Sequence, residues 1–220
     1  MFSNKPFFMK RVIIAIFLSL SFTTLYATDW ELKKDQDGIK VFSASVPNSN
    51  IKAVKVECML TASPSQLVAL LLDTKAHEQW VYSTKISYLV KKVSDLEQIY
   101  YSEIKMPWPI TNRDVLVDFK ITQDTMSRVI SVNATAVSGY IPVKDGIIRV
   151  LLSKVNWTVT PVGNNQLKIE YTAQADPGGS VPAWVVNMFC DKGPFETFKK
   201  LRTMLASGDY KNVHLKFIKD

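Results

Sequence analysis

Residues 176–184, DPGGSVPAW, separate two kinds of sequence within this chain. The segments before them alternate apolar and polar residues as strands do, whereas Asp-Pro-Gly-Gly consists of residues that end a strand. Beyond this stretch, apolar side chains recur at near-helical spacing. They are Val181, Trp184, Val185, Met188, Phe189, Phe195, Phe198, Leu201 and Leu205. The stretch therefore marks the change from a sheet to a long C-terminal helix, which Gly193-Pro194 is expected to kink.

Toward the N-terminus, short turns separate consecutive segments of β-rich sequence. Residues 38–46 and 51–60 predict a hairpin-like opening pair. A helix is predicted from Pro64, with Ser63 as its N-cap, and a second short helical piece from 74 to 80. Further strands are predicted at about 85–94, 96–106, 112–123, 127–137, 147–160 and 165–175. Their short connections indicate an antiparallel meander.

This order of elements predicts an α+β fold in which a curved antiparallel sheet wraps around the C-terminal helix. Two short helical pieces cannot cover the inner face of so large a sheet, so the C-terminal helix must lie across it. An apolar space remains between sheet and helix unless large side chains fill it. Such a space is the first candidate for a ligand site.

The first residues of the chain read as a leader rather than as part of the fold. Lys5, Lys10 and Arg11 precede an apolar run at 12–20, and Ala27 offers a small residue at a cleavage point. The run is shorter than the roughly 20 residues that a membrane-spanning helix needs. We therefore expect a secretory signal peptide at 1–27 and export to the periplasm or beyond the cell. An uncleaved membrane anchor is the alternative.

The charge of the chain at first suggests a nucleic-acid partner, but its distribution does not. The chain has 27 Lys and Arg against 20 Asp and Glu, a net +7. Cleavage of the leader removes three cations, which leaves 24 against 20, or +4. Residues 190–220 hold seven cations and four anions, or +3 of that +4. The body is therefore nearly neutral, and no nucleic acid is expected as a partner. We expect a domain at 28–206 and a charged C-terminal tail at 207–220.

The cysteines and histidines give little sign of chemistry. Cys58 and Cys190 could form one bridge after export or remain two buried thiols, and Cys190 is expected opposite the apolar stripe of its helix, which favours free thiols. His77 and His214 are the only histidines. The sequence contains no HExxH motif, paired-cysteine site, nucleophile elbow or glycine-rich phosphate loop. We therefore expect no cofactor, no metal and no catalytic residue.

Four short motifs carry a resemblance to a known family. The first is the run 107–114, PWPITNRD. The others are Leu72-Asp73 with Trp80, residues 139–149 with GYIP and GIIR, and residues 176–184. In their order and spacing, across about residues 29–206, they resemble the steroidogenic-acute-regulatory-related lipid transfer (START) domains. The resemblance implies a helix-grip fold around an internal hydrophobic tunnel, binding and transfer of a lipid-like ligand, and usually no catalysis.

The inner face of the 112–123 segment includes a cation. Arg113 shares strand parity with Val115, Val117 and Phe119, and a buried guanidinium needs acceptors. The resemblance places it near the ligand, paired with an acid from the neighbouring strand, for which Glu103 is the candidate. A purely structural pair, or an Arg that reaches solvent, is the alternative.

Other residues complete the predicted ligand site. Tyr140 and Ile141 put apolar groups in a loop, where polar residues are usual, and are interpreted as a gate with the C-terminal helix, within 139–146. From that helix Trp184, Met188, Phe195 and Phe198 are expected in the core, some of them lining the ligand space.

Two further interpretations concern partners and activity. The cations Lys192, Lys199, Lys200 and Arg202 on the polar side of the helix suggest transient contact with a membrane surface, although a solvated helix face is the commoner explanation of such a pattern. We expect a monomer. Related helix-grip proteins include cyclases and hydratases, so Arg113, Glu103 and Tyr101 acting on a hydrophobic substrate form the alternative function.

Overall fold

A computed structural model describes residues 29–46 and 52–220, so the predicted leader lies outside the described residues. The described chain forms a ten-stranded sheet whose main path runs β1-β2-β3-β10-β9-β7-β6-β5-β4, and β8 pairs with β6. The strands are β1 (Glu31–Gln36), β2 (Ile39–Ser45), β3 (Lys52–Thr61), β4 (Thr84–Lys92), β5 (Glu97–Ile104), β6 (Arg113–Gln123), β7 (Ile130–Ala136), β8 (Ile148–Arg149), β9 (Leu152–Pro161) and β10 (Gln166–Asp176). Along the main path every pairing is antiparallel, which confirms the predicted curved sheet and helix-grip fold.

Two strands differ from expectation. The edge strand β1 was not predicted, because its sequence, ELKKDQ, is too charged to show strand alternation. The segment predicted as one strand at 147–160 is divided into β8 and β9, because β8 pairs in parallel with the start of β6 while β9 pairs with β7.

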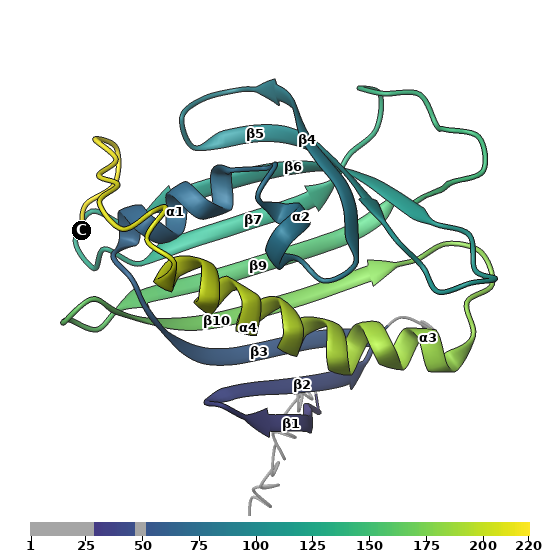
Figure 1. Cartoon of the computed structure of the whole chain (residues 1–220), viewed down its shortest axis with the longest axis horizontal. Helices are drawn as coiled ribbons and strands as arrows, with labels where there is room; N and C mark the ends of the chain where they lie inside the picture. The colour runs from purple at the N-terminus through teal and green to yellow at the C-terminus, as the bar shows by residue number, and fades with distance from the viewer. Residues whose placement is uncertain (1–28, 47–51) are drawn as a thin grey trace, which may run out of the picture.

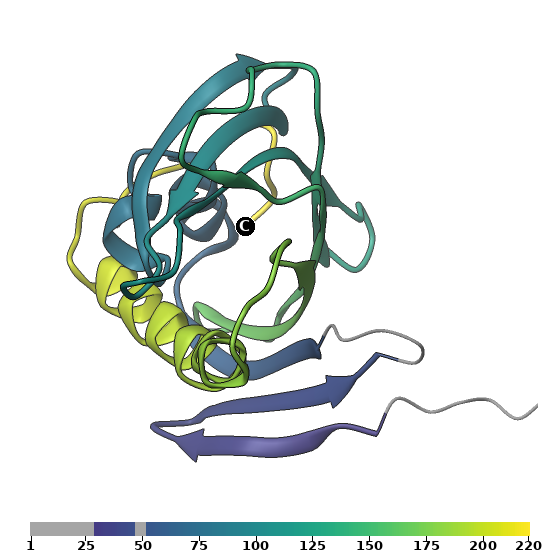
Figure 2. The same ribbon diagram turned by 90° about the vertical axis from the view of Figure 1, so that its right-hand side faces the viewer.

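All helices lie on the inner side of the sheet, which arches over them (Figures 1 and 2). The helix α1 (Pro64–Leu72) begins as predicted, with Ser63 and Gln66 forming a reciprocal capping box and Pro64 in the first turn. It is followed by the short α2 (His77–Trp80). The C-terminal helix then lies along the sheet, as the meander requires.

The C-terminal helix is continuous, and a widened turn takes the place of the predicted interruption. It consists of α3 (Ala183–Asn187), a π-helical turn η1 (Met188–Lys192) and α4 (Gly193–Ala206). A π-turn adds one residue to the helical repeat just before Pro194, which has no N–H to donate. It therefore rotates the apolar stripe. Cys190, expected on the polar side, is only 8% exposed, whereas Trp184, expected in the core, is 53% exposed.

Aromatic side chains fill the space beneath α4. Phe198 is fully buried, and its ring centroid lies 5.0 Å from that of Trp157 and 5.3 Å from that of Tyr171. Tyr100 and Phe119 extend this packing, with centroids 6.1 Å apart. The apolar space predicted between sheet and helix is thus closed along α4, and any cavity must lie elsewhere.

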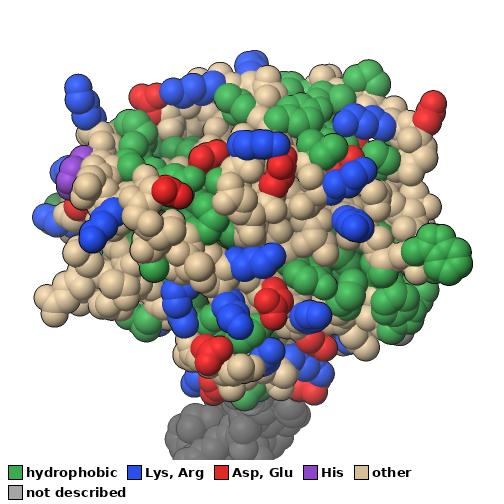
Figure 3. All heavy atoms as spheres, in the orientation of Figure 1, with side chains coloured by type: hydrophobic (Ala, Val, Ile, Leu, Met, Phe, Trp, Pro, Cys, Tyr) green, Lys and Arg blue, Asp and Glu red, His purple; other side chains and the backbone are tan. Residues whose placement is uncertain are grey.

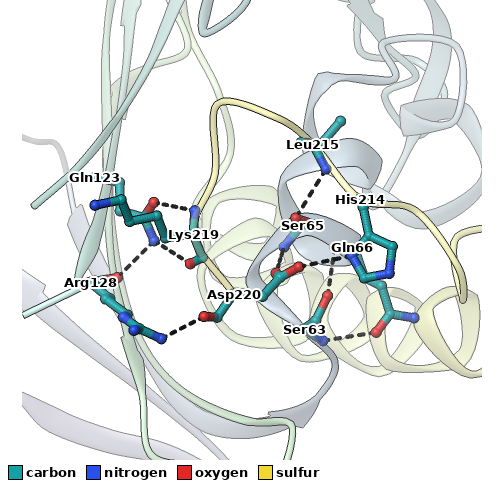
Figure 4. A network of polar contacts seen from close by, with 9 residues as sticks. All are labelled: Ser63, Ser65, Gln66, Gln123, Arg128, His214, Leu215, Lys219 and Asp220. Atoms are coloured by element: carbon teal, nitrogen blue, oxygen red, sulfur yellow. Dashed lines mark hydrogen bonds and ion pairs between the residues drawn. The ribbon is translucent and has the colours of Figure 1, made fainter. Parts of the chain in front are cut away.

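The last residues fold back onto the domain rather than extending from it. Ile218 is only 6% exposed and belongs to the hydrophobic core. Figure 4 shows the polar contacts that fix this segment: the Asp220 carboxylate accepts from the Ser65 N–H at 2.7 Å, and the Gln123 side chain bonds both the N–H and the carbonyl of Lys219 at 2.8 Å. Residues 207–220, predicted as a charged tail, therefore pack on the end of the sheet where α1 begins.

Candidate functional site

A cavity of about 760 Å³ lies at the opposite end of the sheet, beneath α3 and η1. Its volume is within the range of roughly 300–1,000 Å³ found for small-molecule sites. The start of β6, the end of β10 and the connection to α3 contribute most of the wall. The apolar wall includes Ile104, Met106, Val150, Val181, Val185 and Phe189. The cavity therefore occupies the part of the sheet-helix interface that large side chains leave open.

An aromatic pair forms part of the wall of this cavity. The rings of Tyr82 and Phe189, both in the lining, meet edge to face with centroids 5.7 Å apart. The helix can approach Tyr82 closely because position 193 is glycine: a Cβ there would lie 3.1 Å from Tyr82 Cδ1. Gly193 thus allows the start of α4 to pack closely against Tyr82.

Arg113 is the buried cation of the cavity wall. Arg113 is only 3% exposed, and its guanidinium donates to the backbone carbonyls of Thr111, Pro177 (3.1 Å) and Gly178 (3.0 Å). Burial lowers the pKa of this guanidinium. The sequence parity correctly placed Arg113 on the inner face, and its bonds hold the β10–α3 connection against the start of β6.

The glycines of that connection allow the chain to pass around the guanidinium. Gly178 and Gly179 have φ angles of +66° and +63°, in the left-handed region that favours glycine. A Cβ at Gly178 would lie 3.2 Å from Ile148 Cγ2, and one at Gly179 would lie 3.9 Å from Arg113 Nη2. The turn read from the sequence as the end of the sheet is therefore also a wall of the cavity.

The predicted pair of Arg113 with Glu103 is wrong. The register places Ile104 opposite Arg113 and Glu103 opposite Asp114, so the two charged side chains point to opposite faces of the sheet. Glu103 instead accepts from Lys85 Nζ at 2.8 Å and Asn112 Nδ2 at 2.9 Å. Burial alone would raise its pKa, but these two partners keep it below the ordinary value.

Tyr101 also lies on the outer face, away from the cavity. Its ring stacks on Tyr88 with centroids 4.9 Å apart, and Lys144 Nζ lies 4.0 Å from its centroid. Burial raises its pKa. Tyr101 and Glu103 are thus covered by the β7–β8 loop and do not face the space that Arg113 lines.

The β7–β8 loop is tied to the sheet by a buried ion pair. Arg149 Nε and Nη2 donate to the Asp114 carboxylate at 2.6 and 3.0 Å, and the two side chains are only 5% and 0% exposed. The same guanidinium donates to the carbonyls of Ile141 and Pro142 at 3.3 Å. Tyr140 is 45% exposed, and neither it nor Ile141 lines the cavity. Their role as a gate remains a prediction.

The C-terminal helix contributes different residues from those predicted. Trp184 is exposed and Met188 half-buried, and neither lines the cavity. Phe195 and Phe198 are buried in the core along α4. Among the predicted site residues, Arg113 alone lies in the cavity wall. The helix lines it with Val185, Val186, Phe189 and Cys190 instead.

The other polar side chains of the lining are Lys52, Gln174, Asp176 and Ser180. Lys52 at the start of β3 donates to Asn187 Oδ1 at 3.1 Å, and the Asp176 carboxylate accepts from the Gly178 N–H at 2.9 Å. Both cysteines are free thiols, as the sequence favoured, and burial raises the pKa of Cys190. Within residues 29–46 and 52–220, no three His, Cys, Asp or Glu side chains gather as a metal would require.

Comparison with known proteins identifies the family of this fold and cavity. The START domain model matches residues 21–208. The chain belongs to the START domain family. A STAR-related lipid transfer protein from Xanthomonas axonopodis has a similar solved structure, with 34% identity, a TM-score of 0.74, and coverage of 81% of this chain and 99% of that chain.

Two relatives extend this comparison. An uncharacterized protein of Pseudomonas aeruginosa is 34% identical over 177 residues, which cover 80% of this chain and 87% of the relative. The mouse phosphatidylcholine transfer protein is 27% identical over 175 residues, which cover 77% of this chain and 80% of the relative. Lipid binding or transfer is the general function that this START domain membership supports. In the part of the chain that the structure describes, no helix is long and apolar enough to span a membrane.

Proposed function

We propose that this START domain protein binds one hydrophobic, lipid-like ligand in the cavity beneath α3 and carries it between membranes. The observation that supports this proposal is the apolar wall around about 760 Å³ in an interface that is otherwise filled with aromatic side chains. Burial of apolar ligand surface would drive binding by about 25 cal/mol per Å², before the costs of association and ordering.

A carrier fits the arrangement of polar groups better than the alternative cyclase-like enzyme. That enzyme would need Arg113, Glu103 and Tyr101 around one substrate, but the strand register places Arg113 on the inner face and the other two on the outer face. A ligand in the cavity would thus meet one of the three groups.

Ligand exchange would require α3 and η1 to move away from the sheet. These segments form one wall of the cavity, and single π-helical turns within helices are rare and occur frequently at functional sites. The β7–β8 loop is a poorer candidate for the main moving part, since the Asp114–Arg149 pair fixes its base. We therefore assign the gate to the helix first and to Tyr140 and Ile141 second.

Exposed apolar side chains around this end form a surface suited to membrane contact. Figure 3 shows hydrophobic side chains gathered at the right-hand end, where α3 and the β5–β6 connection lie in Figure 1. We call them the apolar rim; its members are Trp108, Tyr140, Val143, Leu151, Leu152 and Trp184, exposed by 92, 45, 65, 64, 65 and 53%. Trp and Tyr prefer the boundary between lipid and water. The rim would place the cavity against the bilayer.

The binding proposal is tested by filling the cavity. Val181→Trp places a bulky ring at a half-buried position in the lining, and Val162→Trp makes the same change at a 52% exposed position in the β9–β10 turn. Native mass spectrometry and lipid extraction of the purified proteins should show bound lipid in the wild type and in Val162→Trp, and much less in Val181→Trp. Equal lipid content in all three, with unchanged circular dichroism, would contradict the proposed site.

The membrane proposal is tested with the two tryptophans of the rim. Trp108→Ala combined with Trp184→Ala should reduce co-sedimentation with phosphatidylcholine vesicles several-fold. Met126→Ala is the control, because Met126 is 91% exposed in the β6–β7 turn, at the other end of β6. Binding unaffected by the double change, or equally affected by the control, would overturn the assignment of the rim. Acidic vesicles would show whether cations of α4 such as Lys199 and Lys200 contribute.

The cellular location, domain bounds and oligomeric state of the protein are proposed from its sequence. We propose export through a leader at 1–27, a domain at 28–206 onto which residues 207–220 fold, and a monomeric protein that takes no nucleic acid. N-terminal sequencing of the protein recovered from the cell should give Thr28 as the first residue, and sedimentation should give one chain. Recovery of intact Met1 in the membrane fraction would support the uncleaved anchor instead.

A further inference from the structure

The charge of Arg113 has no carboxylate partner among the described residues. Its hydrogen bonds go to three backbone carbonyls. Within residues 29–46 and 52–220, no carboxylate lies within 4.0 Å of its guanidinium nitrogens. Carbonyls satisfy N–H groups, but they do not neutralise a formal charge. A cation kept 97% from water without an anion normally costs several kcal/mol.

Two acidic residues close to Arg113 in the sequence form ion pairs with other cations. Asp114 is held by Arg149, and Glu103 by Lys85, both on the outer face. Asp176 is the one acid in the cavity wall, and its carboxylate accepts from the Gly178 N–H and is partly exposed. Lys52 adds a second cation to the lining. The wall thus has two cations and one anion, an excess of one positive charge.

The guanidinium also retains donors. Arginine has five N–H groups, and three are used by Thr111, Pro177 and Gly178, which leaves two on the terminal nitrogens. A carboxylate or phosphate oxygen is the acceptor that matches a guanidinium best. The cavity therefore combines an apolar wall with one place prepared for an oxyanion.

We propose that the ligand is a compact amphiphile with one hydrocarbon chain and an acidic head, a carboxylate or a phosphate monoester, whose oxyanion binds Arg113. This inference rests on the proposed function and names its ligand class. The single chain follows from the size of the space: about 760 Å³ is a volume that buries a drug-sized molecule, and Phe198, Trp157 and Tyr171 fill the interface along α4, where a second chain would otherwise extend.

The wild-type protein tests this without any substitution. Palmitic acid, hexadecyl phosphate and the neutral methyl palmitate share nearly the same chain, and each would compete with the neutral fluorescent probe N-phenyl-1-naphthylamine. At least one acid should displace the probe at about tenfold lower concentration than the ester, the gain expected for hydrogen bonds to a charged group. The stronger acid identifies carboxylate or phosphate as the preferred head.

The outcomes distinguish failure of the acidic-ligand inference from failure of the hydrophobic-carrier proposal. An ester that competes as well as both acids would overturn the acidic ligand while leaving a hydrophobic carrier. Failure of the probe and of all three ligands to bind would refute the carrier and this inference together. Dioleoyl phosphatidylcholine serves as a further arm, and stronger competition by this two-chain zwitterion than by either acid would also overturn the inference.

Substitution then assigns the contact to Arg113. Arg113→Met should abolish the preference for acid over ester, and Arg113→Lys, which keeps the charge without the planar fork, should retain part of it. Because Arg113 also holds the β10–α3 connection, the preference is measured only on variants with a cooperative unfolding transition. Arg128→Met is the control, since Arg128 lies at the other end of the molecule beside Asp220. A folded Arg113→Met with the full preference would overturn the assignment.

Discussion

The Asp114–Arg149 pair predicts a large and local loss of stability when one partner is removed. Arg149→Met leaves the Asp114 carboxylate 0% exposed with its two charged hydrogen bonds broken. Removal of one partner from a buried pair costs about 3–5 kcal/mol. The carbonyls of Ile141 and Pro142 also lose their donor, although water can replace it at this loop.

The free energy of unfolding measures this effect directly. Urea denaturation followed by tryptophan fluorescence should show a loss of about 3–5 kcal/mol, and the midpoint of thermal unfolding should fall by about 10 °C for a domain of this size. Lys92→Met is the control: Lys92 and Asp95 are 2.7 Å apart but 62 and 61% exposed, so this change should cost less than about 1 kcal/mol.

A double variant distinguishes the unpaired charge from the loss of packing. Asp114→Leu with Arg149→Met removes both charges, so it should be more stable than Arg149→Met alone. If the free energy of unfolding of Arg149→Met were no lower than that of Lys92→Met, the argument would be refuted, because the Asp114 carboxylate would then have found another partner or water.

Three further predictions concern the core, the connection and pH. Phe198→Ala should cost about 3–5 kcal/mol in urea unfolding and should extend the cavity along α4, so that longer ligands bind; an unchanged limit on chain length would contradict the aromatic barrier. Gly178→Ala should cost more than Gly146→Ala, because both have positive φ but only Gly178 also lies 3.2 Å from a side-chain atom; equal losses would mean that this contact has no effect. Burial lowers the pKa of His77 below its usual 6.5, so the unfolded chain takes up its proton first, and the free energy of unfolding should fall as pH decreases below about 6.5. His77→Gln should flatten that pH dependence.

The fold could be predicted from the sequence because its signals are local and mutually consistent. The turn at 176–179, the cap at Ser63 and the alternation along the strands each depend on neighbouring residues only. The edge strand β1 was missed because a charged edge has no burial pattern to reveal it.

The site was predicted less well because it depends on register and helical phase. Arg113 was placed correctly from parity within one strand, but its pairing with Glu103 needed the register across the 105–112 connection, which the sequence does not specify. Trp184 was placed in the core from the helical spacing of 181–189, with a rotation of the apolar face expected only at Gly193-Pro194, whereas the π-helical turn η1 already begins at Met188. One additional residue in that turn shifts the helical phase by about 100°, so Trp184 faces outward while Val185 stays buried and Cys190 lines the cavity.

The position of the packed aromatic cluster has a consequence for the kinetics of exchange. Because Phe198 and its neighbours, and then residues 207–220, lie between the cavity and the far end of the sheet, a ligand bound in the proposed site would have to enter and leave on the α3 side. An incoming molecule cannot push the bound one out ahead of itself. Replacement must pass through the empty protein, so the observed exchange rate should reach a plateau set by dissociation and become independent of the concentration of competitor.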